Sequence, residues 1–193
     1  MLGSIGPTGE SLADDEYADI FAEQVGALMS AGVDGFCVET VCSVGEGVAV
    51  ARAIRVRSDQ FLILSFTLRS EDNQVVTLAG ENLTAVVAAA EGAGVDVVGL
   101  NCVGWDVARE SARLLMEKTQ LPLAVSPNAG VPDTIGGRLS YPVSEVDLAE
   151  RMAQLIESGV RIVAGCCGTG AEYIATLRAL IDRSKAHRQQ ELE

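Results

Sequence analysis

Basic, aromatic and histidine residues are scarce in this chain of 193 residues. Lys and Arg total 14 against 27 Asp and Glu, which gives a formal net charge of -13. A chain this acidic repels the phosphate backbone of nucleic acids, so we expect no nucleic-acid partner. The only histidine, His187, lies in the polar C-terminal stretch. This position excludes a histidine-based catalytic triad and a histidine-ligated zinc site.

Long apolar runs are also missing. No segment reaches the roughly 18 apolar residues that a membrane span needs, and no basic-then-apolar leader opens the sequence. The cysteine count is five, an odd number, and Cys166 and Cys167 are adjacent. Adjacent Cα atoms lie about 3.8 Å apart, below the usual disulfide range, so we expect reduced thiols. These features predict a cytoplasmic protein with cysteines free for metal binding or catalysis.

Strand-like and helix-like segments alternate along the chain, and no linker divides it. Apolar stretches at 35–40, 61–66, 95–102, 121–126 and 160–164 predict strands, and 3–9 reads as a strand end followed by a Gly/Pro loop. Helical periodicity is expected at 15–31, 44–57, 82–91, 107–118, 143–157 and 172–185. About six β/α units therefore predict an α/β fold with a parallel sheet, and strands that are apolar throughout predict cover on both faces.

Similar joints occur where three helices meet the next strand: 31–35 (Ala-Gly-Val-Asp-Gly), 93–97 (Ala-Gly-Val-Asp-Val) and 158–162 (Ser-Gly-Val-Arg-Ile). They favour a repeating architecture, either an open doubly wound sheet or a (β/α)₈ barrel. The pattern alone slightly favours the open sheet, because a barrel usually needs about 250 residues. We expect one domain over 1–185 and a polar C-terminal tail over 186–193.

Three cysteines follow predicted strands. Cys102 lies at the end of the predicted strand 95–102. Cys166 and Cys167 follow the predicted strand 160–164, within 165–168 (Gly-Cys-Cys-Gly). Reactive residues of parallel β/α folds gather at the carboxyl ends of strands. Three thiolates can hold Zn²⁺ and leave its fourth tetrahedral position open, as in a catalytic site. Glycines on both sides of the pair give the backbone freedom to turn both sulfurs to one metal.

The remaining cysteines favour another interpretation. Cys37 lies inside an apolar strand and is expected to act as a small hydrophobic residue. Cys42 follows Glu39 near the same rim, and we expect no direct role for it. A thiol redox protein is disfavoured because the chain has no Cys-x-x-Cys pair.

The split cysteine motif, Asn101-Cys102 followed by 165–168, resembles the zinc signature of the homocysteine S-methyltransferase family. Other segments match that family in order: 3–9 (Gly-Ser-Ile-Gly-Pro-Thr-Gly), Glu39-Thr40, and 127–130 (Pro-Asn-Ala-Gly). The form of 3–9 is most similar to the homocysteine-binding module of cobalamin-dependent methionine synthase. The resemblance runs across nearly the whole chain.

The resemblance implies a (β/α)₈ TIM barrel with Zn²⁺ at its C-terminal mouth, bound by Cys102, Cys166 and Cys167. It implies transfer of a methyl group to the thiol of homocysteine, forming methionine. Glu39 aligns with a family glutamate that contacts the amino acid end of homocysteine, and Asn101 and Asn128 flank the site as further substrate-binding candidates. The donor could be methylcobalamin, a methylfolate, betaine or an S-methylated sulfonium.

The N-terminal part departs from the family pattern. The family has two more β/α units upstream, with an Asp-Gly motif and a Glu-Thr-Asn-Thr-like segment, and neither motif occurs here. Six strands do not close an eight-stranded barrel. The alternative expectation is therefore a non-catalytic remnant or partial subunit, which needs another chain or forms a homo-oligomer.

Overall fold

The computed structural model describes residues 1–10 and 12–190. Its main sheet is parallel and six-stranded, in the order β1-β2-β3-β6-β7-β10. The strands are β1 (Leu2–Ile5), β2 (Gly35–Val41), β3 (Phe61–Phe66), β6 (Val97–Asn101), β7 (Leu123–Ser126) and β10 (Ile162–Val163). The helices are α1 (Asp14–Ser30), α2 (Val44–Arg55), α3 (Leu83–Gly92), α4 (Trp105–Met116), α5 (Glu145–Glu157) and α6 (Ala171–Gln190). The predicted alternation of strands and helices is confirmed.

The three similar joints have one structure. At each of them a glycine follows the helix with a positive φ, +79° at Gly32, +65° at Gly94 and +116° at Gly159. The next N–H then donates to the carbonyl five residues earlier, as in Val33 to Leu28, Val95 to Ala90 and Val160 to Leu155. This is a helix C-terminal motif that needs a left-handed residue, so glycine is favoured. The repeated motif therefore sets the same helix-to-strand turn at each of these joints.

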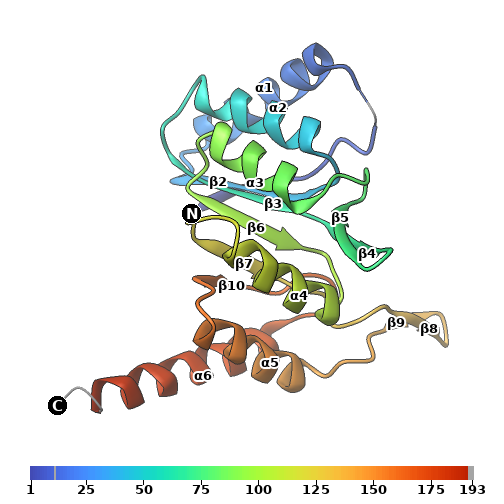
Figure 1. The fold of residues 1–193 in the computed structure, drawn as a ribbon, viewed down its shortest axis with the longest axis vertical. Helices are drawn as coiled ribbons and strands as arrows, with labels where there is room; N and C mark the ends of the chain where they lie inside the picture. The colour runs from blue at the N-terminus through green and yellow to red at the C-terminus, as the bar shows by residue number, and fades with distance from the viewer. Residues whose placement is uncertain (11, 191–193) are drawn as a thin grey trace.

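The helices pack on one face of the sheet. Leu62, Leu64 and Phe66 of β3 point toward the helices and belong to the main apolar core. Ile63, between them, belongs instead to a small separate cluster with Val97 and Ala124, which are residues of β6 and β7. Figure 1 shows the strands stacked from β2 to β10 with α2, α3, α4 and α5 on the near side. One-sided cover is typical of a barrel wall and not of a doubly wound sheet.

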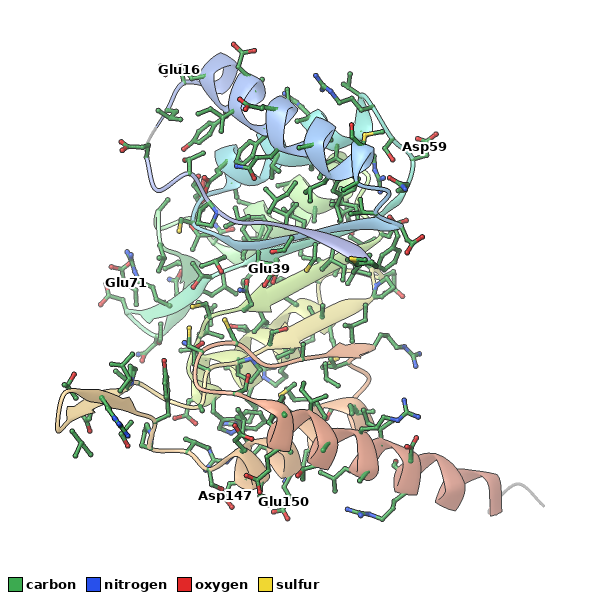
Figure 2. All side chains as sticks on the ribbon, turned by 180° about the vertical axis from the view of Figure 1, so that it is seen from behind. Glu16, Glu39, Asp59, Glu71, Asp147 and Glu150 are labelled. Carbon is green, nitrogen blue, oxygen red and sulfur yellow. The ribbon has the colours of Figure 1, made fainter. Side chains whose placement is uncertain are left out.

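The opposite face of the sheet, called the inner face here, carries small and polar side chains. It includes Ser4, Glu39, Ser65 and Ser126, which alternate with core residues along their strands. Figure 2, seen from behind, shows Glu39 in the middle of the molecule. The expectation of helices on both faces is therefore wrong for the described residues: alternating residues of each strand face either the helices or this more polar surface.

Two β-hairpins were not predicted. β4 (Leu68–Glu71) pairs with β5 (Gln74–Thr77), and β8 (Asp133–Ile135) pairs with β9 (Arg138–Ser140), both antiparallel. Their two-residue turns are Asp72-Asn73 and Gly136-Gly137, and all four residues have positive φ. Such turns suit the twist of a hairpin. Figure 1 shows both hairpins on the side to which the arrow of β6 points.

The C-terminal helix is longer than expected. α6 continues to Gln190, so residues 186–190 of the expected tail are helical. Residues 191–193 lie outside the described residues. Among the described residues, no helix combines the length and the apolar character that crossing a membrane requires.

Candidate metal centre

The structure brings the three predicted ligand cysteines together. Cys102 follows β6, and Cys166 and Cys167 follow β10, which is two strands further along the sheet. Their sulfur atoms all lie within 4.8 Å of one another, and the Sγ atoms of Cys102 and Cys167 are 3.8 Å apart. In the part of the chain that the structure describes, this is the one cluster of three or more potential metal-binding side chains.

The spacing of the sulfurs fits a tetrahedral zinc site. Zinc–sulfur bonds of about 2.3 Å at tetrahedral angles place two sulfurs about 3.8 Å apart. The separation of 3.8 Å between Cys102 and Cys167 agrees with this value. The three potential ligands are thiols, and soft sulfur ligands of this kind bind zinc well. Three protein ligands leave a fourth position for a substrate, so the cluster matches a catalytic site better than a structural one.

The backbone turns sharply at Cys102 to aim its sulfur at the others. Cys102 has φ of +58°, which is uncommon for a residue with a side chain. Its N–H donates to the carbonyl of Ser126 at 3.2 Å, which continues the pairing of β6 with β7 one step beyond the strand. The left-handed residue therefore ends the strand while keeping its backbone hydrogen bond, and the side chain stays at the rim.

Gly165 and Gly168 are needed for different reasons. Gly168 has φ of +81°, and a Cβ there would also collide with the ring of Tyr141. Gly165 has an ordinary φ, but a Cβ there would collide with the side chain of Thr169. Thr169 closes the turn by donating from Oγ1 to the carbonyl of Cys166 at 2.8 Å. The predicted role of the glycines thus divides into conformational freedom at Gly168 and space at Gly165.

Backbone hydrogen bonds from the loop after β7 hold the adjacent cysteines Cys166 and Cys167. The N–H of Cys166 donates to the carbonyl of Pro127 at 3.0 Å, and the carbonyl of Cys167 accepts from the N–H of Ala129 at 2.9 Å. Asn128, a predicted substrate-binding residue, accepts from the N–H of Cys167 through Oδ1 at 3.1 Å. The loop after β7 therefore fixes the position of both adjacent cysteines, and Asn128 lies beside the cysteine cluster.

Tyr173 supports the same loop from the core. This side chain is fully buried, and its hydroxyl donates to the carbonyl of Ala164 at 2.9 Å, just before the cysteine turn. The N–H of Tyr173 donates to a carboxylate oxygen of Glu145 at 2.6 Å, which ties α6 to α5. Burial raises the pKa of the Tyr173 hydroxyl above its ordinary value, so the hydroxyl remains a donor.

In the absence of a metal, the surroundings of Cys102 and Cys166 disfavour their charged thiolate forms. Burial, followed by the neighbouring Cys166 thiol, raises the pKa of Cys102 to about 12. Burial, followed by Cys167, also raises the pKa of Cys166. Because charged thiolates this close would repel one another, the metal-free form favours the protonated thiols of Cys102 and Cys166 at neutral pH. A divalent cation reverses this balance, because ligation stabilises thiolates and releases those protons.

Glu39 lies on the inner face, and Asn101 lies at the end of β6 beside the cysteine cluster. Glu39 is partly exposed on β2, and its Oε1 accepts from the hydroxyl of Ser4 at 2.8 Å. Asn101 is the last residue of β6 and is only 2% exposed. Its amide contacts Thr40, the residue after Glu39, and lies near Cys166. Asn101 therefore connects the β2 rim with the cysteine cluster.

The other two cysteines lie outside the cluster. Cys37 packs beside the inner-face residues Ile63, Val97 and Ala124, as expected for a small hydrophobic residue. Burial raises its pKa to about 11, with a smaller effect from the charge of Glu39. Cys42 donates weakly to the carbonyl of Thr40 at 3.4 Å. Both thiols therefore serve as controls for the three clustered ones.

Sequence reasoning missed Tyr141, Thr169 and Tyr173, which shape the cysteine loop. Thr169 had a local signal, because it follows Gly168 and can bond back to the turn. Tyr141 and Tyr173 had none, since their contacts depend on how separate segments pack.

A family model described as Homocysteine S-methyltransferase matches residues 1–181. The methionine synthase of Mycobacterium leprae is 31% identical over 193 aligned residues, covering 95% of this chain and 16% of that protein. The homocysteine S-methyltransferase of Escherichia coli is 31% identical over 194 aligned residues, covering 93% of this chain and 62% of that protein.

Solved structures give the same result. The apo crystal structure of the E. coli homocysteine methyltransferase MmuM superimposes with a TM-score of 0.78 at 29% identity, covering 93% of this chain and 62% of that one. Its metallated form gives a TM-score of 0.77 at 28% identity, covering 92% and 60%. The expected α/β class and TIM-barrel relationship are thereby confirmed. This chain spans less than two thirds of these relatives.

Proposed function

The chain belongs to the homocysteine S-methyltransferase family, and we propose that it takes part in transferring a methyl group to the thiol of homocysteine, forming methionine. The observation that carries the proposal is the convergence of Cys102, Cys166 and Cys167 at one rim, with sulfurs within 4.8 Å. Such a cluster suits a reaction whose nucleophile is itself a thiol, because one more sulfur completes the coordination.

We propose Zn²⁺ as the cofactor, held by the three clustered cysteines. When bound, it supplies a positive charge that keeps the homocysteine sulfur anionic near neutral pH, where a free thiol with a pKa near 8.5 is mostly protonated. The chain's own residues provide the geometry. Asn128 and the backbone of Pro127 and Ala129 fix the cysteine pair, so the site need not reorganise when substrate arrives.

We propose that Glu39 binds the ammonium group at the amino acid end of homocysteine. Its carboxylate is partly exposed on the inner face, and the Ser4 hydroxyl holds one oxygen. A carboxylate with its second oxygen available can accept a charge-assisted hydrogen bond from the substrate. Asn128 completes the proposed substrate-side residues at the rim. Asn101, which is buried, contributes to the proposed substrate site through its hydrogen bonds to Thr40, the residue next to Glu39.

The proposed methyl donors are methylcobalamin, a methylfolate, betaine and an S-methylated sulfonium compound. In each of them the methyl carbon is bonded to a cobalt, nitrogen or sulfur atom that can leave with the bonding electron pair while the thiolate forms a new sulfur–carbon bond, so the same sulfur chemistry serves all of them. Methylation assays with each donor in turn distinguish these classes. The five free thiols fit the reducing cytoplasm as the proposed location.

A second candidate function follows from the open edges of the sheet. β1 and β10 are its two outer strands, and six strands leave a barrel wall unclosed. We propose as the alternative that these residues act as part of a larger barrel, completed by another chain or by a homo-oligomer, or persist as a non-catalytic remnant. Metal binding with no methyl transfer by the isolated chain would favour this alternative.

The test is metal content of the purified chain by elemental analysis, with zinc-edge X-ray absorption in the absence and presence of homocysteine. We expect about one zinc per chain and sulfur ligands that increase from three to four when homocysteine is added. A chain that takes up no zinc would overturn the metal-site proposal. Zinc with unchanged sulfur coordination would overturn the substrate assignment.

A further inference from the structure

Both polar atoms of the Asn101 side chain make hydrogen bonds inside the protein. Its Oδ1 accepts from the backbone N–H of Thr40 at 2.8 Å, and its Nδ2 donates to the Thr40 hydroxyl at 2.8 Å. The same Nδ2 lies 4.0 Å from Sγ of Cys166. Asn101 is 2% exposed, so water does not compete for these contacts. One amide thus links the end of β2 to a proposed metal ligand.

Thr40 has a backbone conformation that needs such support. Its φ is +62°, and a β-branched residue in the left-handed region is a genuine outlier. The pairing of β2 with β3 is irregular at the same place, between Val38 and Val41. At this irregular position Thr40 makes two hydrogen bonds with the Asn101 side chain, one donated by its N–H and one accepted by its hydroxyl, and these hold the strand end turned. Asn101 therefore holds Thr40, the residue next to Glu39, in its left-handed conformation.

The Nδ2 atom of Asn101, which donates to Thr40, also faces the sulfur atom of Cys166. A donor that is itself held in place fixes the rotamer of the ligand side chain that accepts from it. Thr40 anchors the Nδ2 group by accepting one of its two hydrogens, which leaves the other directed toward Cys166. Removing the anchor would free the amide to rotate, and the contact with the sulfur would weaken.

We infer that Asn101 is a positioning residue that couples the Glu39–Thr40 turn of β2 to the metal ligand Cys166. This inference rests on the proposed function, because it assumes that the cysteine cluster binds zinc. It goes further by making the strained β2 turn part of the metal site. The hydroxyl of Thr40 then contributes to zinc affinity although it is not itself a ligand.

The experiment measures zinc affinity of the metal-free chain by competition with a chromophoric chelator. Asn101→Ala should weaken zinc binding by about 10–100-fold, the usual effect of losing a group that orients a metal ligand. Thr40→Val, which keeps the shape but removes the hydroxyl, should weaken it in the same direction. Thr40→Ser, which keeps the hydroxyl, should bind zinc like the unmodified chain.

Asn82→Ala is the matched control. Asn82 also uses its Oδ1 to accept a backbone N–H, that of Ala85 at 3.0 Å, but it caps the N-terminus of α3, and its side chain has no hydrogen bond to Cys102, Cys166 or Cys167. It should lower stability without changing zinc affinity. A second readout is the sulfur-to-cobalt charge-transfer band of the Co²⁺-loaded protein, which should shift in Asn101→Ala and Thr40→Val and stay unchanged in Asn82→Ala.

The outcomes separate this inference from the proposed function. If the unmodified chain binds no zinc, both are overturned. If it binds zinc but Thr40→Val has unchanged affinity and an unchanged cobalt band, the coupling is overturned and the proposed function stands. Thr40→Val also decides the question if Asn101→Ala fails to fold, because the valine variant retains the backbone N–H bond to Asn101.

Discussion

The sulfur atoms of Cys102 and Cys167 lie 3.8 Å apart although 65 positions separate them in the sequence. They come from strands on either side of β7, and each of their turns bonds to that strand or to the loop after it. The cysteine cluster therefore depends on the sheet register, because shifting β6 or β10 by one residue against β7 would point the sulfurs apart.

Alanine at any of the three clustered cysteines should abolish zinc uptake. Removing one thiolate leaves two sulfurs, too few for stable tetrahedral binding by this cluster. Cys37→Ala is the control, since Cys37 lies in the small inner-face cluster and should keep zinc. Elemental analysis after dialysis checks the prediction. Full zinc content in Cys166→Ala would show that the ligand assignment is wrong.

Alanine at Gly168 should destabilise the protein and weaken metal binding. The substitution puts a side chain at φ +81° and against the ring of Tyr141, so a cost of about 1–3 kcal/mol is expected. Gly26→Ala is the control, because Gly26 lies inside α1 with no atom within 4 Å of the added Cβ. Urea unfolding should show Gly26→Ala as stable as the unmodified chain or up to about 1 kcal/mol more stable. Equal stability of both variants would contradict the steric argument.

Tyr173→Phe should cost about 1 kcal/mol at neutral pH, because the carbonyl of Ala164 loses its donor. The pH dependence has a definite sign. Burial raises the folded-state pKa of Tyr173, so its contribution is fully present below the unfolded pKa near 10 and is lost as pH rises through the folded value.

Urea unfolding of the metal-free protein at pH 8 and near pH 11 checks this sign. Cysteine titration affects both proteins alike, so the difference between them isolates the phenol. The gap between the unmodified chain and Tyr173→Phe should shrink or reverse at the higher pH. A gap that widens would refute the assignment.

Glu39→Gln should raise KM for homocysteine without loss of zinc. Glutamine keeps an acceptor for the Ser4 hydroxyl but removes the charge that attracts the substrate ammonium group, so about a tenfold effect or more is expected. Glu23→Gln, an exposed position on α1, is the control and should leave KM unchanged. The assay uses whichever donor supports methyl transfer. An unchanged KM in Glu39→Gln would remove Glu39 from the substrate site.

The sequence was sufficient to locate the cluster but not its support. Cys102 and the adjacent pair follow apolar strands, and parallel strands end at one rim, so their proximity could be predicted. The hairpins had readable signals in Asp72-Asn73 and Gly136-Gly137, the residue types favoured in two-residue turns. The link from Asn101 to Thr40 joins residues 61 apart and depends on strand register, which no local pattern encodes.

In the main sheet the spatial order of the strands follows their order in the chain. Each new β/α unit can therefore dock on the one synthesised just before it, with no long search for a distant partner. The first sulfur of the cluster arrives with β6 and the other two only after β10. During synthesis, the three-cysteine cluster would therefore be completed only when β10, the sixth strand of the sheet, has paired with β7. Zinc binding by the proposed site would then report that this pairing has formed.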